Sequence, residues 1–284
     1  MRAASRQSYA AALERLDRFA DGAGPEQLRT VADELLAVAG LLARQARLRR
    51  ALSDPARSGE DRAELLRGLL GERLAEPTRQ LLDVLVAGRW SAPSELLDGC
   101  EQLGVQALLA SAGAGPDGTG GAGGAVGQLP EVEDELFRFG QLVAGNPALA
   151  AAIGDRTVPV ERRAALVDAL LGGKAGEVTV GLVRVALGGF GGRSVAGALT
   201  RLVELAAQRR DLRVAYLTVA TPLTEQAEQR LGAALSARYG RDISVKTTVD
   251  PRVLGGARVQ IGADLYDGTI ARRLAQARTA LATG

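Results

Sequence analysis

The stretch from Asp250 to Ala277, DPRVLGGARVQIGADLYDGTIARRLAQA, combines residue types that often do chemistry. Its glycines at Gly255 and Gly256 could bring the backbone close to a phosphate, and its arginines could bind an anion. It contains no obvious nucleophile, metal-ligand set or phosphate-binding loop. The other interpretation is structural: the two glycines let the chain turn or bulge into a strand, Asp267-Gly268 turns it again, and the arginines face outward.

Histidine is absent from the chain, and cysteine occurs once, as Cys100. The absence of histidine removes the commonest general base and metal ligand, together with every Ser-His or Cys-His mechanism. A single cysteine cannot form an intrachain disulfide, which fits a reducing compartment. We therefore predict no catalytic residue, no cofactor-binding residue and no metal site.

Three glycine-rich motifs resemble phosphate-binding loops but stand in the wrong context. GAGPDG at Gly113 fits the dinucleotide pattern, yet a predicted helix precedes it and Pro116 interrupts it. GGKAGE at Gly172 lacks the Ser or Thr that follows a P-loop lysine. GGFGGRS at Gly188 could hold an anion through its arginine and serine, but a loop between helices is the simpler interpretation.

Charged clusters and the single tryptophan also have structural explanations. The acidic run Glu133-Asp134-Glu135 begins a predicted helix, where it suits the positive end of the helix dipole. Trp90 follows a predicted helix and is as easily a core residue as a binding residue. Pairs of arginines are expected on solvated helix faces: Arg49-Arg50, Arg209-Arg210 and Arg272-Arg273.

An internal repeat organises most of the chain. VADELLAVAGLLA, which starts at Val31, is matched 101 residues later by VEDELFRFGQLVA, which starts at Val132. Between residues 31–86 and 132–187, 20 of 56 aligned pairs are identical without a gap. Chance would give only a few identities, so we infer a duplicated unit. The matched pairs include Arg62 with Arg163 and Thr78 with Thr179.

Each copy is predicted to be a bundle of helices. In the first copy, leucines and valines recur at helical spacing from Leu35 to Leu42. Further helices are expected over Glu60–Leu70 with Gly71 as a C-cap, over Thr78–Ala87 and over Leu96–Leu109. Only the first copy is preceded by an additional helix, Ser5–Phe19. The second copy would then be a spacer or would borrow a helix.

A glycine-rich linker separates the copies, and a different pattern follows the second one. Residues 113–127, GAGPDGTGGAGGAVG, are predicted to be a flexible coil. After Arg210, strands are expected over 214–220, 243–249 and 257–261. A helix is expected over Thr224–Tyr239, with Thr224 as N-cap and Gly240 as C′ glycine. A last helix is marked by an apolar stripe: Ile270, Leu274, Ala277 and Leu281.

The predicted fold is therefore mainly α, with two homologous helical bundles, a linker and a small α/β C-terminal domain. Its boundaries are 1–112 for the first bundle, 113–127 for the linker, 128–212 for the second bundle and 213–284 for the α/β domain. This organisation places the opening stretch, from Asp250 to Ala277, in the last of these units.

Charge and hydropathy argue against nucleic acid and membrane as direct partners. The net charge is only +2, too small for a nucleic-acid footprint. No apolar run approaches the ~20 residues that a membrane span needs. The start, MRAASRQSYAAALERL, has no signal-peptide apolar region. An organelle transit peptide is the alternative, but Tyr9, Leu13 and Leu16 recur at helical spacing and favour a first helix.

The stretch from Ile243 to Gly262, ISVKTTVDPRVLGGARVQIG, resembles the signature of delta subunits of F-type ATP synthases. That family includes the mitochondrial oligomycin-sensitivity-conferring protein. DGTIARRL, from Asp267 to Leu274, resembles the closing run of the family, and SYAAALERL resembles its first helix. The signature positions are Val249, Asp250, Val253, Gly255, Gly256, Val259, Gly262, Asp267 and Gly268.

The chain departs from the common family pattern in its length. Ordinary members have one bundle and one small C-terminal domain, whereas here the bundle is copied. Enlarged delta subunits of this kind resemble those of actinobacteria. Because two bundles are present, the resemblance does not say which copy takes the family's usual partner.

The resemblance implies a peripheral-stalk, or stator, subunit without catalytic activity. Such a subunit joins the N-terminal helix of an alpha subunit in the catalytic head to the C-terminal helices of the membrane-anchored b subunit, so that rotation is coupled to proton flow. It implies a peripheral location on the cytoplasmic face of the bacterial plasma membrane.

Helix-in-groove docking suggests where such partners would bind. Candidate residues for the alpha helix are Tyr9, Leu13, Leu81, Val84 and Leu85. Candidates for partner contact in the closing run are Ile270, Arg273 and Leu274. Core packing is the alternative for each residue of the bundle.

Two other classes of function remain open at this point. One is a nucleotide-binding enzyme that uses GAGPDG or GGKAGE, which calorimetry with NAD and ATP would reveal. The other is a stand-alone helical adaptor, which gene neighbourhood would separate from a stator subunit.

Overall fold

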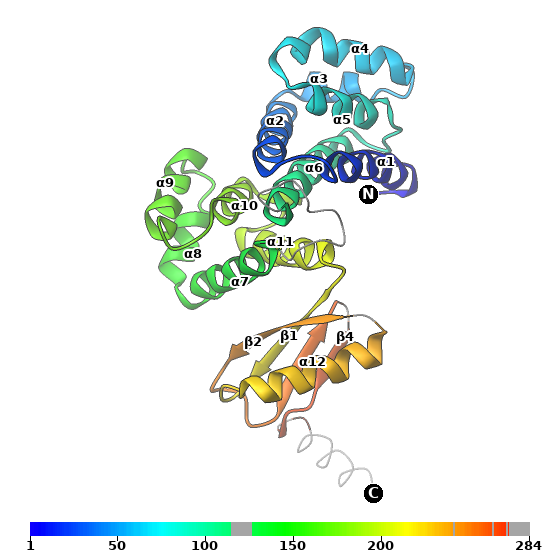
Figure 1. Cartoon of the computed structure of the whole chain (residues 1–284). Helices are drawn as coiled ribbons and strands as arrows, with labels where there is room; N and C mark the ends of the chain where they lie inside the picture. Colours follow the sequence, from blue (N-terminus) through cyan, green and yellow to red (C-terminus); the bar gives the residue numbers. More distant parts are fainter. Residues whose placement is uncertain (115–126, 241, 263, 271, 273–284) are drawn as a thin grey trace, which may run out of the picture.

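Two helical bundles are followed by a small sheet domain in the computed structural model, which describes residues 1–114, 127–240, 242–262, 264–270 and 272 (Figure 1). The helices of the first bundle are α1 (Ala3–Ala20), α2 (Pro25–Arg44), α3 (Ala46–Leu52), α4 (Gly59–Leu70), α5 (Glu76–Ala87) and α6 (Pro93–Gly113). Those of the second are α7 (Leu129–Gly145), α8 (Pro147–Gly154), α9 (Val160–Leu171), α10 (Glu177–Gly188) and α11 (Val195–Arg209). The C-terminal domain contains β1 (Arg213–Val219), α12 (Glu225–Tyr239), β2 (Ile243–Val249), β3 (Ala257–Ile261) and β4 (Asp264–Asp267).

The mainly α fold predicted from the sequence is confirmed, with differences at short elements. Helix α4 begins with a capping box, because the Ser58 hydroxyl accepts a hydrogen bond from the Asp61 amide at 3.1 Å. Gly71 follows that helix, but it keeps a right-handed backbone (φ −57°) and starts a 3₁₀ turn, η1 (Gly71–Arg73), in place of a left-handed cap. The short helices α3 and α8 and the strand β4 were not predicted.

The duplication is visible helix by helix. Adding 101 to the bounds of α4 gives residues 160–171, the bounds of α9, and adding it to those of α5 gives 177–188, the bounds of α10. Helices α2 and α3 correspond in the same way to α7 and α8 within a few residues at their starts. The repeat in sequence is therefore a repeat in structure.

Matched polar residues make equivalent helix-to-helix hydrogen bonds in the two copies. Glu34 accepts a hydrogen bond from the Ala75 amide at 3.0 Å, and Glu135 accepts one from the Gly176 amide at 3.0 Å. Each carboxylate thus meets the start of α5 or α10, where amides lack helical partners. Glu135, the last residue of the acidic run, therefore serves the N-terminus of a neighbouring helix, where the sequence had suggested its own.

A buried arginine closes the far side of each bundle. Arg62 donates to the Ser58 and Ala87 carbonyls, at 3.3 and 3.1 Å. Its counterpart Arg163 donates to three carbonyls: those of Val158 at 3.1 Å, Ile153 at 2.9 Å and Leu187 at 2.9 Å. The Ala87 and Leu187 carbonyls lie in the last turns of α5 and α10, where intrahelical donors are lacking, so the guanidinium groups satisfy them.

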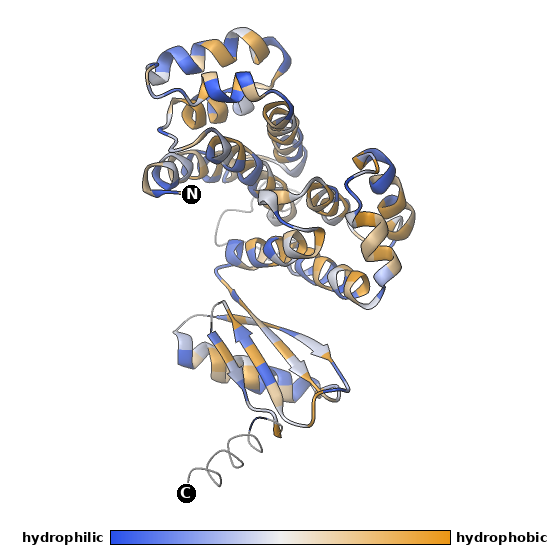
Figure 2. Ribbon diagram, turned by 180° about the vertical axis from the view of Figure 1, so that it is seen from behind, coloured by the Kyte–Doolittle hydropathy of each residue, from blue (hydrophilic) through white to orange (hydrophobic). Residues whose placement is uncertain are grey.

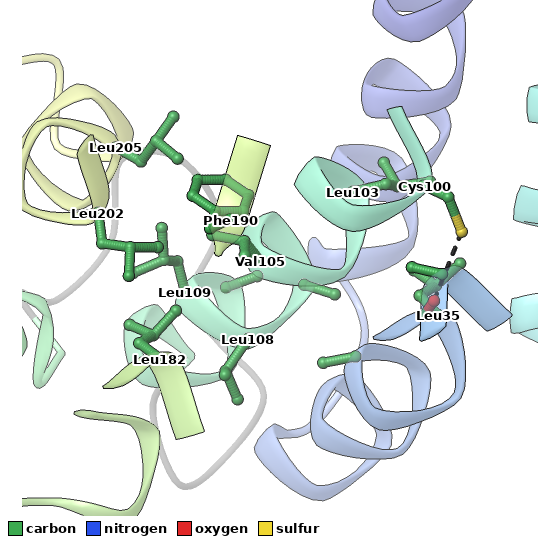
Figure 3. Close-up of a cluster of buried hydrophobic side chains, with 14 of the residues drawn as sticks. Leu35, Cys100, Leu103, Val105, Leu108, Leu109, Leu182, Phe190, Leu202 and Leu205 are labelled. Carbon is green, nitrogen blue, oxygen red and sulfur yellow. Dashed lines mark hydrogen bonds between the residues drawn. The ribbon is translucent and has the colours of Figure 1, made fainter. Parts of the chain in front are cut away.

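Helix α6 belongs to both bundles. Its first half packs on α1, α2 and α5, and its second half, Gly104–Gly113, also contacts α7, α10 and α11. Figure 3 shows this change of partner along the helix: Leu103 and Cys100 lie near Leu35, whereas Leu109 lies among side chains of the second copy. One hydrophobic core therefore extends through both bundles.

The position of α6 gives the second copy a helix in the place that α1 takes in the first copy. Shifting α1 by 101 residues gives a range that begins at Gly104, so the second half of α6 stands where the first helix of the second copy would be. Of the two options left open by the sequence, a spacer or a borrowed helix, the structure shows the borrowed helix.

Close helix packing around α6 depends on glycines. A Cβ added at Gly99 would lie 2.5 Å from the Trp90 ring, and one added at Gly104 would lie 2.8 Å from Leu36. Trp90 itself is buried and donates its indole N–H to the Leu85 carbonyl at 2.9 Å. It is therefore a core residue that rests on a glycine of α6.

The C-terminal sheet has the strand order β2-β1-β3-β4. Strands β1 and β2 are parallel and joined by α12, whereas β3 and β4 pair antiparallel to their neighbours. Thr224 caps α12 as expected, since its hydroxyl accepts from the Ala227 amide at 3.2 Å, and Gly240 is left-handed (φ 65°). Strand β4 was missed because its four residues are mostly exposed and carry no apolar alternation.

Strand β1 joins the sheet domain to the second bundle. Its alternate residues Ala215 and Leu217 pack with the α12 side of the sheet, whereas Val214 and Tyr216 pack on the helical core. In Figure 2, apolar and polar residues alternate along β1 and along the bundle helices. One face of the sheet therefore packs on α12, and on the other face residues of β1 and β2 contact the second bundle, whose Phe137 stacks on Tyr216 at a centroid distance of 6.3 Å.

Candidate functional site

The glycine-rich motifs do not form phosphate-binding loops in the described residues. GAGPDG begins at the last residue of α6, so a helix precedes it as expected, and its positions 115–118 lie outside the described residues. GGKAGE forms the turn after α9, where the Lys174 amide bonds to the Leu171 carbonyl at 2.9 Å. GGFGGRS contains the 3₁₀ turn η2 (Phe190–Gly192) between α10 and α11, as expected for a loop.

Two features are absent from the described residues. Among the described residues, no group of three or more His, Cys, Asp or Glu side chains could hold a metal ion. In the same ranges, no helix is both long and apolar enough to cross a membrane. The residues that the sequence singled out for partner contact lie on α1, on α5 and in the closing run of the sheet domain.

The candidates on α1 and α5 divide into core and surface. Leu81 and Leu85 are 1% and 0% exposed, so both belong to the core of the bundle. Leu13 and Val84 are half-buried at the edge of the core. Tyr9 is also half-buried, and burial raises its pKa to about 12 against the opposing charges of Arg201 and Arg209 on α11. Tyr9 therefore lies towards the second bundle.

The surface between α1 and α5 runs between two clefts. At one end, Arg15 donates a hydrogen bond to Gln80 beside a cleft of about 390 Å³ that Phe19 and Leu81 also line. At the other end, Ala4 and Ala87 line a second cleft of about 620 Å³. Ala11 and Val84 fall between these ends. We call this surface the α1–α5 face: Ala4, Ala11, Arg15, Gln80, Val84 and Ala87.

The matching surface of the second copy is covered. On α1, Ala4, Gln7, Ala10 and Ala11 are exposed. In the second half of α6, which takes the place of α1, every residue from Gly104 to Ala112 is buried. Packing against the first bundle covers this helix on the side that α1 leaves open. Only the first copy therefore presents this helix face as an open surface.

The signature glycines near the C-terminus serve backbone geometry. Gly255 and Gly256 have left-handed backbones, with φ values of 65° and 78°. A Cβ at Gly256 would lie 2.4 Å from the Gly268 carbonyl oxygen, and one at Gly255 would lie 2.6 Å from Ile270. Only glycine fits both the angles and the space. The structural interpretation of this stretch is therefore supported by its geometry.

The signature aspartates stabilise the two turns. Asp250 accepts from the backbone amide and side chain of Arg252, at 3.0 and 2.9 Å, which lowers the pKa of its carboxyl. Asp267 accepts from the Thr269 amide and hydroxyl, at 3.0 and 2.7 Å, and these bonds lower its pKa. Both carboxylates act as turn acceptors, a use that needs no substrate.

Apolar side chains surround these turns at the end of the sheet domain. Val249, Leu254 and Ile270 are 44%, 65% and 50% exposed. Val253 is half-buried, Val259 is buried in the sheet, and Gly262 turns the chain with φ 58°. Ile270 and Arg272 are helical, as expected for the last helix. The candidates Arg273 and Leu274 lie outside the described residues.

A buried charge cluster that sequence reasoning missed joins the sheet domain to the second bundle. Glu133 on α7 is 0% exposed and pairs with Lys246 at 2.8 Å and Arg210 at 2.9 Å. Ser244 donates to the same carboxylate at 2.5 Å, and Lys246 also pairs with Asp134. Such a network fixes one orientation of the sheet on the bundle, since each charge needs its partner when buried.

Arg209 and Arg210, at the end of α11, form ion pairs, although the sequence suggested that they lie on a solvated helix face. Arg209 donates to Gln106 at 3.1 Å and to Asp17 at 3.0 Å, so it links α11 to α6 and α1. The prediction of solvated faces is thus wrong for Arg209 and Arg210, because both meet acids from distant elements. The signal that could have revealed the cluster is Lys246, one of only two lysines, on the strand face opposite the apolar residues.

Comparisons with known proteins identify what the chain is similar to. A family model described as ATP synthase delta (OSCP) subunit matches residues 6–103 and 122–281, so one match falls on each copy of the bundle. A protein named ATP synthase subunit delta from Salinispora arenicola (strain CNS-205) is 61% identical over 280 residues, which cover 99% of this chain and 98% of that protein. Proteins with that same name from Salinispora tropica and Streptomyces avermitilis are 58% and 44% identical over the same length.

Proposed function

The chain belongs to the ATP synthase delta (OSCP) subunit family, and from this membership we propose that it is a non-catalytic peripheral-stalk subunit of a proton-translocating ATP synthase. In this role it joins the catalytic head to the membrane-anchored b subunit, and it holds the head still while the central shaft turns. Such a subunit needs rigidity and affinity. The core that runs through both bundles supports this role, because it makes one stiff body of two copies.

The first copy is the proposed site for the N-terminal helix of an alpha subunit. The observation that carries this assignment is the difference in exposure between α1 and the second half of α6. An amphipathic helix can approach closely along the small side chains Ala4, Ala11 and Ala87. Its apolar anchors would meet Val84 and the cleft that Phe19 and Leu81 line.

A matched pair of valines tests this assignment. Val84 and Val185 are 101 residues apart, at equivalent positions of α5 and α10, and both are half-buried. Calorimetry with a peptide of the alpha-subunit N-terminal helix should show binding weakened at least about tenfold by Val84→Glu. Val185→Glu is the control and should bind as the unchanged chain does. Equal losses in the two variants, or no binding of the peptide to the unchanged chain, would contradict the assignment.

The C-terminal domain is the proposed site for the b subunit. The exposed apolar residues around the signature turns, Val249, Leu254 and Ile270, support this proposal, and the sequence adds Arg273 and Leu274 to them. A peptide from the C-terminal helices of the b subunit should bind the full chain. Ile270→Asp should weaken that binding, whereas Leu69→Asp, at a leucine that is 52% exposed in the first bundle, should leave it unchanged.

Contacts at the two ends of the chain would reinforce each other. Once one partner is bound, the second binding event is intramolecular, and moderate affinities combine into strong retention. These partners would place the protein at the cytoplasmic face of the bacterial plasma membrane as a peripheral component. Full-chain pull-downs with both peptides, compared with the Val84→Glu and Ile270→Asp variants, would measure how far each end contributes.

A further inference from the structure

The larger of the two clefts beside the α1–α5 face is lined by arginines. Arg57, Arg62 and Arg89 contribute to its wall, and no Asp or Glu does. Its volume of about 620 Å³ is within the range of clefts that hold ligands. A second cleft of about 420 Å³ shares Arg57 and Trp90 with it and adds Arg50 together with one acid, Asp54, which lies 4.0 Å from Arg57. We call the pair the arginine cleft.

One of these arginines is a buried cation without an ionic partner. Arg62 is 4% exposed, and within the described part of the chain no carboxylate oxygen lies within 4 Å of its guanidinium. Burial lowers its pKa, the charge of Asp54 opposes that shift, and the charge of Arg89 adds to it. A buried charge in this state is stabilised by any anion that reaches it.

The second copy shows the same arginine in a closed arrangement. Nη1 of Arg163 donates to the carbonyls of Ile153 and Leu187. In the first copy, the described residues offer Nη1 of Arg62 no such acceptor, and its hydrogen bonds come from Nε and Nη2. The arginine of the first copy therefore keeps a donor available at the wall of the cleft.

The other two arginines are absent from the corresponding positions of the second copy. Residues 101 positions after Arg57 and Arg89 are Val158 and Phe190. Phe190 is 1% exposed and packs on α6, so it fills space where the first copy has a charged and exposed side chain. The cationic lining is thus a feature of the first copy alone.

We propose that the arginine cleft binds a carboxylate-rich segment of a partner chain. Guanidinium groups bind carboxylates through paired hydrogen bonds, and three of them around one cleft favour an acidic sequence over a neutral one. Two features favour a segment of chain over a small anion. The two adjoining clefts together exceed the size of one anionic group, and Ala4 and Ala87 connect them to the α1–α5 face, so a chain on that face reaches them.

The single tryptophan provides a local reporter for this binding. Trp90 is the only tryptophan of the chain and lines both clefts. Titration of the full chain with hexaglutamate, at constant ionic strength, should change Trp90 emission in a saturable manner. Hexaglutamine should leave the emission unchanged. No change with hexaglutamate, or the same change with hexaglutamine, overturns the proposal.

Matched charge removal tests the role of the arginines. Arg57→Gln with Arg89→Gln removes two exposed charges of the cleft, and should weaken hexaglutamate binding at least about tenfold. Arg162→Gln with Arg230→Gln removes two exposed charges elsewhere and should change it by less than about twofold. Equal losses in the two double variants would show a general charge effect and overturn the proposal.

Two further measurements separate this inference from its alternatives. Inorganic phosphate at the same ionic strength should not displace hexaglutamate, and displacement would identify a phosphate site in its place. The titration contains no alpha-subunit peptide, so its failure and the failure of docking on the α1–α5 face are independent results. Thermal unfolding of each variant by circular dichroism checks that the exposed substitutions leave the fold intact.

Discussion

The two copies of the bundle share a fold but differ in which surfaces they leave open. The first copy exposes the α1–α5 face and an arginine cleft, whereas the second covers the matching helix and fills the matching corner with Phe190. At one core position the first copy has Ala32 and the second has Glu133, which carries the sheet domain. The first copy therefore leaves this helix face and this cleft open, whereas the second copy uses the matching positions for internal contacts.

The largest expected effect concerns the helix that both copies share. Leu109→Asp places a charge in the common core and should destabilise the chain by at least about 4 kcal/mol. Leu109→Ala, at about 3 kcal/mol, is the milder variant if the first does not fold. The measurement is urea unfolding followed by circular dichroism, which sees all helices, and by Trp90 emission, which sees the first bundle.

The two signals should shift together in these variants, because the core is continuous. Leu142→Asp, at a leucine of α7 that is 49% exposed, serves as control and should change stability by less than about 0.5 kcal/mol. The two copies would be independent domains if the variant kept the urea midpoint of Trp90 emission but showed a lower urea midpoint by circular dichroism.

A second test removes the charge that distinguishes the second copy. Glu133→Ala makes α7 resemble α2 at this position and leaves Lys246 and Arg210 without their buried partner. We expect a loss of about 3 kcal/mol and faster proteolysis between the second bundle and the sheet domain. Asp134→Ala removes the half-exposed partner of Lys246 and should cost less than about 1 kcal/mol. Equal costs would show that the cluster acts through surface charge alone.

A third test compares the matched buried arginines. Arg163 donates to three carbonyls, whereas Arg62 donates to two, one of which also accepts a backbone amide, so Arg163→Met should cost about 2 kcal/mol and Arg62→Met about 1 kcal/mol. Urea unfolding of both variants gives the comparison. A larger cost at Arg62 would mean that its free donor is already satisfied in solution, which would also weaken the case for the arginine cleft.

The smallest expected effect is the pH dependence of stability that comes from one contact between the two copies. Glu101 on α6 accepts from the Gly191 amide at 3.0 Å, and burial raises the pKa of its carboxyl against that bond. The folded chain therefore holds this proton to a higher pH than the unfolded chain. Between the unfolded and folded pKa values, the contribution of Glu101 to stability falls as pH rises. Glu101→Gln keeps an acceptor for Gly191 and should remove that slope from mildly acidic stability curves.

Asp267 in the sheet domain should give a pH dependence of stability with the opposite sign. Its pKa is lowered by Thr269, so its contribution is present above the unfolded pKa and is lost as pH falls through the folded pKa. Asp267→Asn should therefore reduce the loss of stability in acid. The same direction of change in both variants would contradict the assignment of these slopes.

Much of the fold was predictable because it follows local patterns. The long helices have apolar periodicity, Thr224 and Gly240 bound α12, and the duplication is visible as identities at one offset. The glycines Gly255 and Gly256 were interpreted correctly because left-handed turns restrict residue choice more than almost any other feature.

What could not be predicted depends on contacts between distant residues. Glu133 has the local pattern of a helix-start acid, and its partner Lys246 lies more than a hundred residues away. Leu81 and Leu85 match the spacing of docking anchors, but that spacing is the same for a buried core stripe. The double role of α6 leaves no mark within the helix except glycines at close contacts and an apolar circumference.

Because the second half of α6 is shared by both copies, further copies of the unit could be added to the chain in the same way. Because the last helix of one unit is also the first of the next, units join end to end without a joint that must be designed separately, as in repeat proteins. Helix α11 stands 101 residues after α6, yet it ends at Arg209 and strand β1 begins at Arg213, so the sheet domain occupies the place of a third unit's first helix. The sheet domain is in this sense a terminal cap, and the number of units before it sets the reach of the protein.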